Sequence, residues 1–489
     1  MLLNNALKEL TALQKGSPPM NANGIVDDVV TSFRENLRPV VMAIQEAHDG
    51  GLSPSRFCQF ISSLKDVIHQ AGREAFVSTV EGLDEAGNSV EHEGKSYRFK
   101  MASRKDWLTP FGRVAIERKY YQQDEGGEGI VPIDVRCGMV DRYMTPDVEE
   151  ISTFASAILV PGEVHTLLDK LLPQTPSVKA IQRALADVGR FAESNHDEIE
   201  EVIRRDFPLS SEGDVLVISW DGKMVPLREP GVKTGRPPER PGIRMSDETP
   251  TAWREAGVAT VSIYGPLDQE GRPQRLDAQY FARMPEAGME TLLQQQVDLV
   301  RHLQGTRSFR EFAIICDGKK TIWTIAEETP EYAAATLILD FYHAAEHLSN
   351  VAEALFGKGN EQAKSWFKKY RNRWQLDRNG VEATIRSIRH YRKALRKGTE
   401  QFLVATRVIR YFTRNRERMR YADFIARGLP IGSGPVEAAC KTVVGHRINR
   451  SGMRWSREGG QMVLSLRTRV LSNRWDSLWS SYMDQRATA

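Results

Sequence analysis

The sequence predicts a multidomain α/β protein with a helical N-terminal region, a small β-element and a basic all-helical segment. Three observations support this fold class. At 489 residues, the chain is long enough for roughly three domains. With 40% hydrophobic and 27% charged residues, its composition is that of a chain that folds around a core. Along the chain, helical spacing of apolar residues gives way to the alternation and short apolar runs of strands, and then returns.

The changes in spacing divide the chain into six segments. They are a helical N-terminal region at 1–92, a small β-element at 93–143, a helical region at 144–210, an α/β unit at 211–358, a basic helical segment at 359–427 and C-terminal helices at 428–480. No repeat of fixed period and no low-complexity tract interrupts them.

Composition also limits the cellular setting. The four cysteines are far apart in the sequence, so there is no CxxC metal pair and no dense disulfide framework. The first twenty residues are too polar for a secretory signal, and no apolar run approaches the roughly 18 residues of a membrane span. We therefore expect a cytoplasmic protein without a membrane partner.

Two helices of the first 210 residues carry specific expectations. Phe57, Ile61, Leu64 and Ile68 recur at the interval of one helix face, which predicts that this face is buried. The amphipathic helix at 177–191 either packs in a helical bundle, which is the simpler interpretation, or recognises DNA ends as part of a helix-turn-helix.

Five apolar runs beyond residue 214 predict strands. They are DVLVISWDG, GVATVSIYG, RLDAQYFAR, FAIICDG and TLILDFYH, with one helix before the fourth run and another after the fifth. The first, fourth and fifth runs are almost continuously apolar, as in strands buried on both faces, whereas the second and third alternate, as nearer an edge. The segment 231–250 is rich in Pro, Gly and Arg and predicts an exposed basic loop.

Acidic residues close three of these runs. Asp221, Asp317 and Asp340 follow the first, fourth and fifth, and ligands bind at the carboxyl ends of strands in open α/β sheets. Two neighbouring aspartates suit shared coordination of divalent cations. The alternative is a plain Asp-Gly turn, because Asp221 and Asp317 both precede glycine. Glu437, near the start of a predicted helix, either caps that helix or completes the carboxylate cage.

A competing pattern lies just after Asp340. His343 and His347 in HAAEH satisfy H-x-x-E-H, in which two histidines on one helix face bind zinc beside a general-base glutamate. This pattern leaves a zinc-dependent hydrolase open as an alternative.

Considered together, Asp221, Asp317 and Glu437 resemble the acids of the insertion-sequence DDE transposases, and the chain is most similar to the ISKra-type group. The resemblance covers roughly residues 105–480. It is carried by TPFGRVAIERKYY, VPIDVRCG, SWDGKMV, IICDGKKTIW, LDFYHAAEHL and, above all, IGSGPVEAACKTVVGHRINRSGMRWSREGGQMVLSLR.

This resemblance implies an RNase-H-like mixed-sheet catalytic core. Asp221, Asp317 and Glu437 would be its catalytic and metal-binding residues, with two Mg²⁺ or Mn²⁺ ions. The implied strand order, with the first strand beside the fourth and the fifth beyond it, favours Asp317 over Asp340 as the second acid. The basic helical segment becomes an insertion between the fifth strand and the last catalytic helix.

The resemblance also assigns secondary roles and one absence. Asp340, His343 and His347 become accessory residues that orient the site or touch the DNA end. Relatives commonly carry a Cys-pair zinc ribbon after the upstream YY, but the stretch YYQQDEGGEGIVPID has no cysteine. We therefore predict no zinc.

The charge distribution predicts where DNA binds. The whole chain carries only +3, yet residues 361–427 hold 19 basic and six acidic residues, a net charge of +13. Residues 441–475 hold eight basic residues and one acidic residue, a net charge of +7. With Glu437, the segment 361–475 reaches +19 and the rest of the chain −16, so near-neutrality is a cancellation.

The candidate DNA-binding residues lie in these two segments. They are Lys368, Lys369, Arg371, Arg373, Arg389, Arg392, Lys393, Lys441, Arg447, Arg450, Arg454, Trp455 and Arg457. Trp366, Tyr370, Trp374 and Tyr391 are interleaved with them and are expected to offer ring faces to unpaired bases. Trp455 either stacks on a base or fills the core.

The sequence thus predicts metal-dependent cleavage of DNA at transposon ends and transfer of the cut strand into target DNA. The expected partners are double-stranded DNA and further copies of the chain, in a homodimer or larger synaptic assembly associated with the nucleoid. A domesticated relative that binds DNA without transposing is the other alternative, beside the zinc hydrolase.

Overall fold

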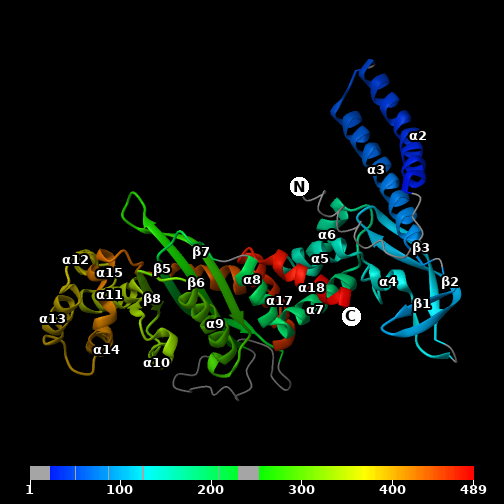
Figure 1. Ribbon diagram of the computed structural model, residues 1–489. Helices are drawn as coiled ribbons and strands as arrows, with labels where there is room; N and C mark the ends of the chain where they lie inside the picture. Colours follow the sequence, from blue (N-terminus) through cyan, green and yellow to red (C-terminus); the bar gives the residue numbers. More distant parts are fainter. Residues whose placement is uncertain are drawn as a thin grey trace. The chain divides into compact units, whose positions relative to one another are not determined.

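The computed structural model describes residues 22–49, 51–85, 87–123, 126–206, 209–228 and 253–488. The fold is mixed α/β, with two separate sheets and a majority of helical residues (Figure 1). The chain divides into two compact units: one runs to Asp187 and resumes at Trp479, and the other is Val188–Leu478. No helix in the described ranges is both long and apolar enough to cross a bilayer. The predicted basic loop at 231–250 lies outside the described residues.

The first unit begins with two long antiparallel helices, α2 (Ala22–Asp49) and α3 (Pro54–Gly82) (Figure 1). Ser53 caps α3, because its hydroxyl accepts a hydrogen bond from the Arg56 N–H, and Pro54 suits the first turn. The prediction of a buried face in α3 is wrong, since Phe57, Ile61 and Ile68 are 42% to 47% exposed. Two paired helices shield only the sides that face each other.

A four-stranded antiparallel sheet follows the helical pair. Its strands, in spatial order, are β1 (Ser89–His92), β2 (Lys95–Thr109), β3 (Gly112–Gln122) and β4 (Gly129–Ile130). The sheet therefore begins four residues before the predicted boundary at 93, and the predicted β-element ends in a short helix, α4 (Pro132–Arg136). Val80 of α3 packs with Trp107 and Ile116 in the core beneath the sheet.

Four helices lead from this sheet to the second unit. They are α5 (Pro146–Ile158), α6 (Pro161–Leu171), α7 (Val178–Ser194) and α8 (His196–Asp206). The predicted helix at 177–191 is α7. Its apolar side is buried, with Ile181 against Val164 and Leu168 of α6, as the bundle interpretation requires.

The second unit is built on a five-stranded mixed sheet. Its strands are β5 (Val215–Pro226), β6 (Trp253–Leu267), β7 (Pro273–Arg283), β8 (Glu311–Cys316) and β9 (Thr336–Leu339). The order is β7-β6-β5-β8-β9; β7, β6 and β5 are antiparallel, whereas β5, β8 and β9 are parallel. All five predicted strands are confirmed, and the first does lie beside the fourth with the fifth beyond it.

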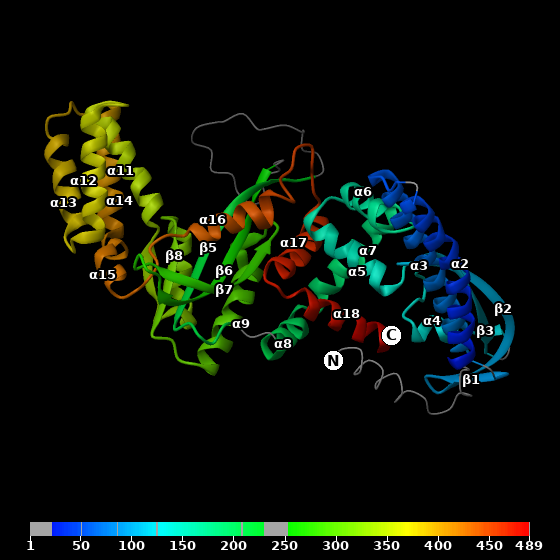
Figure 2. The same ribbon diagram turned by 90° about the horizontal axis from the view of Figure 1, so that it is seen from above.

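Helices pack on this sheet from several parts of the chain (Figure 2). They are α9 (Glu290–Thr306) on β6 and β7, α16 (Gly434–Ala439) on β5 and β6, its π-helical continuation η5 (Cys440–Gly445) on β5, and α17 (Arg457–Leu471) on β7. The last helix is α18 (Trp475–Thr488). The sheet is thus covered by helices that lie before and after the basic segment in the sequence.

Two details of the strands differ from the prediction. β6 is an internal strand buried along most of its length, although its sequence suggested an edge. Asp221 does not end its strand, because β5 continues to Pro226 and remains paired with β6 as far as Trp253. The parallel partner β8 ends at Cys316. The last part of β5 therefore extends beyond β8 and is paired with β6 alone.

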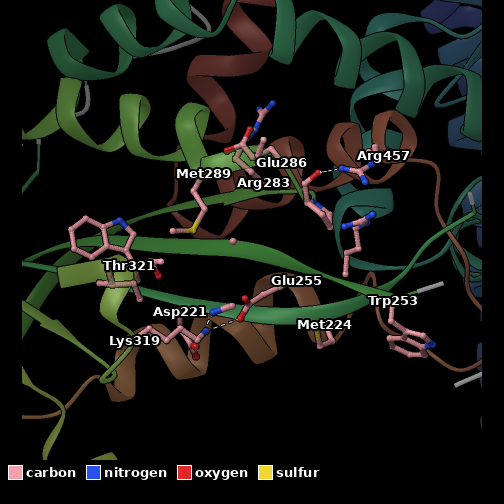
Figure 3. Close-up of a pocket in the computed structure, with 17 residues that line it drawn as sticks. Asp221, Met224, Trp253, Glu255, Arg283, Glu286, Met289, Lys319, Thr321 and Arg457 are labelled. Carbon is pink, nitrogen blue, oxygen red and sulfur yellow. Dashed lines mark hydrogen bonds and ion pairs between the residues drawn. The ribbon is translucent and has the colours of Figure 1, made fainter. Parts of the chain in front are cut away.

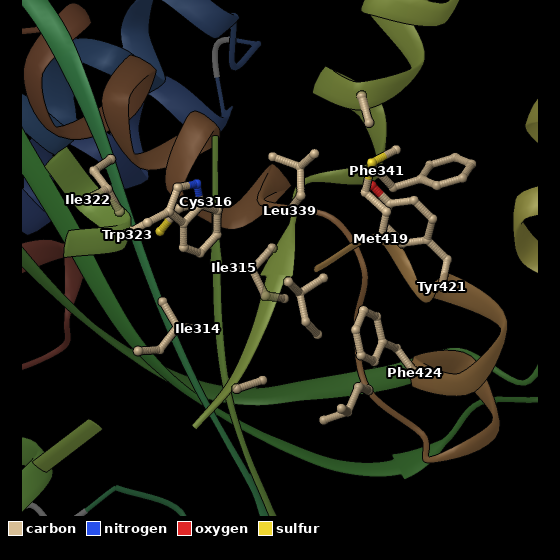
Figure 4. Packing of buried hydrophobic residues seen from close by; sticks show 14 of the residues in the cluster. Ile314, Ile315, Cys316, Ile322, Trp323, Leu339, Phe341, Met419, Tyr421 and Phe424 are labelled. Atoms are coloured by element: carbon tan, nitrogen blue, oxygen red, sulfur yellow. The ribbon is translucent and has the colours of Figure 1, made fainter. Parts of the chain in front are cut away.

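The basic segment is a bundle of helices that shares the core of the sheet. Its helices are α12 (Glu361–Leu376), α13 (Gly380–Arg392), α14 (Glu400–Asn415) and α15 (Tyr421–Ala426), and α11 (Phe341–Phe356), which precedes the basic segment, packs with them. Figure 4 shows Tyr421 of α15 beside Phe341 at the start of α11, and both belong to the same apolar cluster as Leu339 at the end of β9. One continuous apolar cluster therefore joins the bundle to the sheet.

The aromatic residues of α12 contribute to this core. Trp366, Tyr370 and Trp374 are at most 9% exposed. The Trp374 indole N–H donates to the Thr384 hydroxyl at 2.9 Å, and its ring meets Phe412 at 5.4 Å between centroids. The expectation that these rings stack on DNA bases is wrong, because packing between helices already uses their faces.

A buried ion pair joins α8 to α17 within the second unit. The Arg469 guanidinium donates to the carboxylate of Glu200, which also accepts from the Gln279 amide at 3.1 Å. Burial alone would raise the pKa of Glu200, but Arg469, with support from His196 and Gln279, holds that pKa below its ordinary value. Glu200 therefore stabilises the fold when it is ionised.

Replacing Arg469 by Met should lower the free energy of unfolding by about 3–5 kcal/mol, because it leaves a buried carboxylate without a partner. Urea denaturation at pH 7 measures this, and adding Glu200→Leu should restore most of the loss. Because the folded pKa of Glu200 is depressed, the contribution of Glu200 is present above the ordinary glutamate pKa of about 4.3 and is lost as the pH falls through the folded value.

Arg301→Met is the matched control, since Arg301 pairs with Asp298 and Glu331 on an exposed surface. It should cost less than about 1 kcal/mol. Equal losses for the two arginine variants would contradict the role assigned to the buried pair.

Candidate active site

Asp221 projects from β5 in the middle of a ladder. It is paired with Val258 of β6, and its carboxylate accepts the N–H of Gly222 at 2.7 Å. A Cβ at Gly222 would overlap the carboxylate of Glu255, which comes from β6. The Asp-Gly pair is therefore not a turn here, and the glycine makes room for a second acid beside Asp221.

Asp317 directly follows β8, as predicted. Its carboxylate accepts the backbone N–H of Lys319 at 3.0 Å and lies 3.8 Å from the Lys319 ammonium. The same ammonium donates to Glu255 at 2.7 Å. Although burial disfavours its charged form, Glu255, Asp317 and Asp221 raise the pKa of Lys319. A single cation thus bridges acids from β6 and from the end of β8.

Asp340 is fully buried and directly follows β9. One carboxylate oxygen caps α11 by accepting the His343 N–H at 2.5 Å, and the other accepts the backbone N–H of Ser433. The Asp340 N–H in turn donates to the Cys316 carbonyl at 2.9 Å. Both carboxylate oxygens are therefore engaged in fixing backbone, which fits an accessory rather than a metal-binding role.

Ser433 also reaches Glu437. Its hydroxyl donates to the Glu437 carboxylate at 3.3 Å, and its carbonyl accepts the Glu437 N–H at 3.1 Å. With Ser433 as N-cap, Glu437 is the fourth residue of α16, one later than the sequence suggested, and it is exposed. Asp340 and Glu437 are therefore bound to the same serine.

Two buried thiols lie among the acids. Burial raises the pKa of Cys316, and the neighbouring charges of Asp317, Asp221 and Asp340 raise it further. The pKa of Cys440 in η5 is also raised, first by burial and then by Asp221. Asp317 follows Cys316 in the chain and the Asp340 N–H donates to the Cys316 carbonyl, so both aspartates adjoin Cys316 at the ends of β8 and β9.

The three residues of the predicted triad thus lie on β5, directly after β8 and on α16; β5 pairs with β8, and α16 contacts β5. The described part of the chain contains no ready-made group of three or more His, Cys, Asp or Glu side chains with metal-binding geometry. All the acids near the site offer carboxylate oxygens, the donors that Mg²⁺ and Mn²⁺ prefer.

The two histidines of HAAEH lie on one side of α11. Their ring centroids are 5.0 Å apart, and the His347 ring lies 4.2 Å from that of Tyr411 on α14. Burial lowers the pKa of His347, and the positive charges of His343 and Arg407 lower it further. His343 lies 3.8 Å from Glu346, which is largely exposed. One side of the His347 ring is therefore covered by the Tyr411 ring of α14.

Tyr411 connects the bundle to the Asp317 loop. A Cβ at Gly318 would overlap the Tyr411 ring and hydroxyl, and that hydroxyl is buried without a hydrogen-bond partner in the described structure. Burial raises the pKa of Tyr411, and the charges of Asp317 and Asp340 add to this effect. Because the φ angle of Gly318 is not positive, glycine is needed here for close approach and not for a turn.

A cavity of about 640 Å³ opens beside Asp221 (Figure 3). Glu255 and Lys319 line it together with the arginines Arg254, Arg283 and Arg457. Arg457, a predicted DNA-binding residue at the start of α17, donates to the Pro285 carbonyl at the rim. The space next to the candidate site is therefore lined by both acids and guanidinium groups.

The other predicted DNA-binding residues differ in exposure. The exposed ones are Lys368, Lys369, Arg389, Lys393 and Lys441, and the partly buried ones are Arg371, Arg373, Arg392, Arg450, Arg454 and Trp455. Arg373 pairs with Asp377 at 2.8 Å. Arg447 is only 1% exposed and lies over the Trp455 ring at 5.3 Å, while the Trp455 indole donates to the Ile448 carbonyl. Arg447 is thus buried in the interior, and the partly buried Trp455 ring packs against it.

Sequence reasoning missed Glu255, Lys319, Tyr411 and Ser433. Lys319 and Ser433 lie two and four residues from predicted acids, in DGK and SGPVE, so their proximity was available as a signal. Glu255 and Tyr411 are brought in by strand pairing and by the bundle, and no local pattern marks them.

Comparison with known proteins gives no support for any family: no family model matches the chain, and no curated protein matches its sequence. The candidate function rests on the residues and on their geometry.

Gly318→Ala should lower the free energy of unfolding by about 1–3 kcal/mol, because the added methyl forces Tyr411 or the Asp317 loop to move. Tyr411→Leu in the same chain should recover part of the loss. Gly305→Ala is the control, since a Cβ there meets nothing within 4 Å. Chemical denaturation of the three variants checks this, and an equal effect of both glycine substitutions would refute the close approach.

Proposed function

We propose that this protein is a DDE transposase that cleaves DNA at transposon ends and joins the freed strand to target DNA. The observation that carries the proposal is that Asp221 lies on β5 and Asp317 directly follows the adjacent strand β8, with the helix of Glu437 packed against β5. The order of the sheet, three antiparallel strands followed by two parallel ones, supports an RNase-H-like core.

The donor set of this site fits hard divalent cations. Asp221, Asp317 and Glu437 would bind them through carboxylate oxygens. The Lys319 ammonium already lies against Asp317 and Glu255, so positive charge is electrostatically favourable at this position. When bound, two Mg²⁺ or Mn²⁺ ions would lower the pKa of a water molecule and stabilise the charge of the leaving oxygen.

The chain's own residues orient the reacting groups. Asp221 is fixed by a strand, Asp317 by the Lys319 N–H and Glu437 by Ser433. In cleavage, a water oxygen bonds to phosphorus while the bond from phosphorus to the 3′ oxygen breaks, which leaves a 3′-hydroxyl and a 5′-phosphate. In strand transfer, that hydroxyl attacks a target phosphodiester in line with its leaving oxygen. Neither step needs a covalent bond to the protein.

The basic residues around the site would hold the DNA backbone. Lys441 is exposed one turn beyond Glu437, and Arg457 lines the cavity beside Asp221. Lys368 and Lys369 are exposed on α12. These cations would neutralise phosphates that the acidic site by itself repels.

Asp221→Asn, Asp317→Asn and Glu437→Gln should each reduce Mg²⁺-dependent cleavage of a transposon-end duplex by about 10²-fold or more. Each change removes a carboxylate charge whose metal-mediated stabilisation of the transition state is worth several kcal/mol. DNA binding in an electrophoretic mobility assay should persist.

Glu346→Gln is the informative control for this series. Glu346 is the exposed glutamate of HAAEH and would be the general base of a zinc hydrolase. Under the proposal this variant keeps its activity. Loss of activity in Glu346→Gln, with full activity in the Asp221 and Asp317 variants, would favour the hydrolase instead.

DNA affinity should fall about 10³-fold or more between 50 and 200 mM salt, because binding releases counterions from several phosphates. Replacing both Lys368 and Lys369 by Ala should reduce the slope of log K against log salt by about 2. Arg301→Ala, at an ion-paired position outside the basic segment, should leave the slope unchanged. Fluorescence anisotropy measures all three, and an unchanged slope in the double variant would exclude α12 from the interface.

A further inference from the structure

One lysine of the second unit lies between acids from two different parts of the sheet (Figure 3). The Lys319 ammonium donates to Glu255 of β6 at 2.7 Å and lies 3.8 Å from the carboxylate of Asp317, which follows β8. The strand between β6 and β8 is β5. The lysine side chain therefore extends across β5 to reach its closer partner.

Gly222 of β5 provides the space in which Glu255 and Lys319 meet. A Cβ at Gly222 would overlap Oε1 of Glu255, which is the oxygen that accepts the Lys319 ammonium. The φ angle of Gly222 is not positive, so its backbone conformation does not require glycine. Glycine is needed at this position because the Glu255 carboxylate occupies the space that a side chain would fill.

Glu255 and Asp221 lie on opposite faces of the β5–β6 ladder. Asp221 is directly opposite Val258 and shares its face, whereas Glu255 is three residues before Val258 and points to the other face. That other face is covered by α9, because a Cβ at Gly257 would overlap Leu292. Glu255 therefore approaches the candidate site through Lys319, and not from the side on which Asp221 lies.

Solvent reaches all three groups of this arrangement. The side chains of Lys319, Glu255 and Asp317 are 43%, 51% and 25% exposed, and the first two line the cavity of about 640 Å³. Ion pairs in contact with solvent are weak. The ammonium can therefore move away from Asp317 without the loss of a buried interaction.

Building on the proposed function, we propose that the Lys319 ammonium competes with a divalent cation for Asp317, and that Glu255 limits this competition by holding the ammonium on the α9 side of β5. The two distances agree with this division, since Lys319 is hydrogen-bonded to Glu255 and only close to Asp317. A positive charge at this distance offsets repulsion between the acids and also opposes a second cation. Lys319 and Glu255 are thus positioning residues that set the metal affinity of the site.

Binding of Mn²⁺ to the full chain without DNA tests the role of Lys319, with free Mn²⁺ measured by electron paramagnetic resonance. Lys319→Met should bind Mn²⁺ about fivefold more tightly or better, because a positive charge beside Asp317 is removed. Lys319→Arg keeps that charge and should stay within about threefold of the natural chain. Lys320→Met is the matched control at the next, exposed residue, and it should change the affinity less than about twofold.

The role of Glu255 is tested by the same measurement in two backgrounds. Glu255→Gln should weaken Mn²⁺ binding about fivefold in the natural chain, because it leaves the ammonium to Asp317. In the Lys319→Met chain it should change the affinity less than about twofold, since no ammonium remains to be held. Gly222→Ala keeps the charge of Glu255 but displaces its carboxylate, so it should weaken binding in the natural chain and have little effect in the Lys319→Met chain.

A Lys319→Met chain that binds Mn²⁺ no more tightly than the natural chain would overturn the proposal, as would an equal gain in Lys320→Met. Equal effects of Glu255→Gln in both backgrounds would overturn the role of Glu255, because a direct effect of its charge does not need Lys319. Circular dichroism should show unchanged helix content in every variant.

The proposed function is judged by a separate variant in the same assay. If Asp221→Asn leaves Mn²⁺ binding unchanged, the metal site fails and the proposed function fails with it. If Asp221→Asn weakens binding while Lys319→Met does not strengthen it, only the role of Lys319 is refuted.

Discussion

The second unit depends on one buried carboxylate, which ties the end of β9 to the point where the chain returns from the helical bundle. Asp340 stands between the end of β9 and the start of α11, and its side chain accepts the N–H of Ser433, 93 residues later in the chain. The Phe341 N–H donates to the Ile431 carbonyl at 2.9 Å beside it. Because an unpaired buried carboxylate would be costly, this contact fixes where the chain returns after the bundle. The position of α16, and with it Glu437, follows from that return.

The sequence pattern correctly predicted the features of this arrangement that depend on residues close together in the chain. The apolar runs before Asp317 and Asp340 are buried strands that end where the polar residue stands, so both were correctly placed. Asp221 was placed at a strand end because its run stops being apolar, but pairing with β6 carries the strand five residues further. Burial of single side chains was predicted less well. Trp374, which lies among arginines in the sequence, is buried, whereas Phe57 on an amphipathic helix is exposed. Which surfaces meet is a property of the whole fold, and spacing along one helix does not contain it.

Besides carrying many basic residues, the bundle contributes to the geometry of the candidate site. Tyr411 of α14 lies over Gly318, and the same ring packs against His347 of α11. A movement of α14 would therefore displace the Asp317 loop, since close-packed side chains transmit displacement. Under the proposed function, DNA contacts of the bundle would be linked to the position of Asp317 through this one aromatic residue.

The proposed function sets the acids of the candidate site against a negatively charged substrate. Under the proposed function, Asp221, Asp317, Glu255 and Glu437 would repel a phosphodiester that the basic segment would attract. Lys319 reduces the conflict within the site by pairing with Glu255 near Asp317. Cations bound by the carboxylates would compete with this ammonium for the same oxygens. Lys319 thereby offsets part of the repulsion between Glu255 and Asp317 in the folded chain, and in the proposed reaction its release would leave a positive charge beside the substrate phosphate.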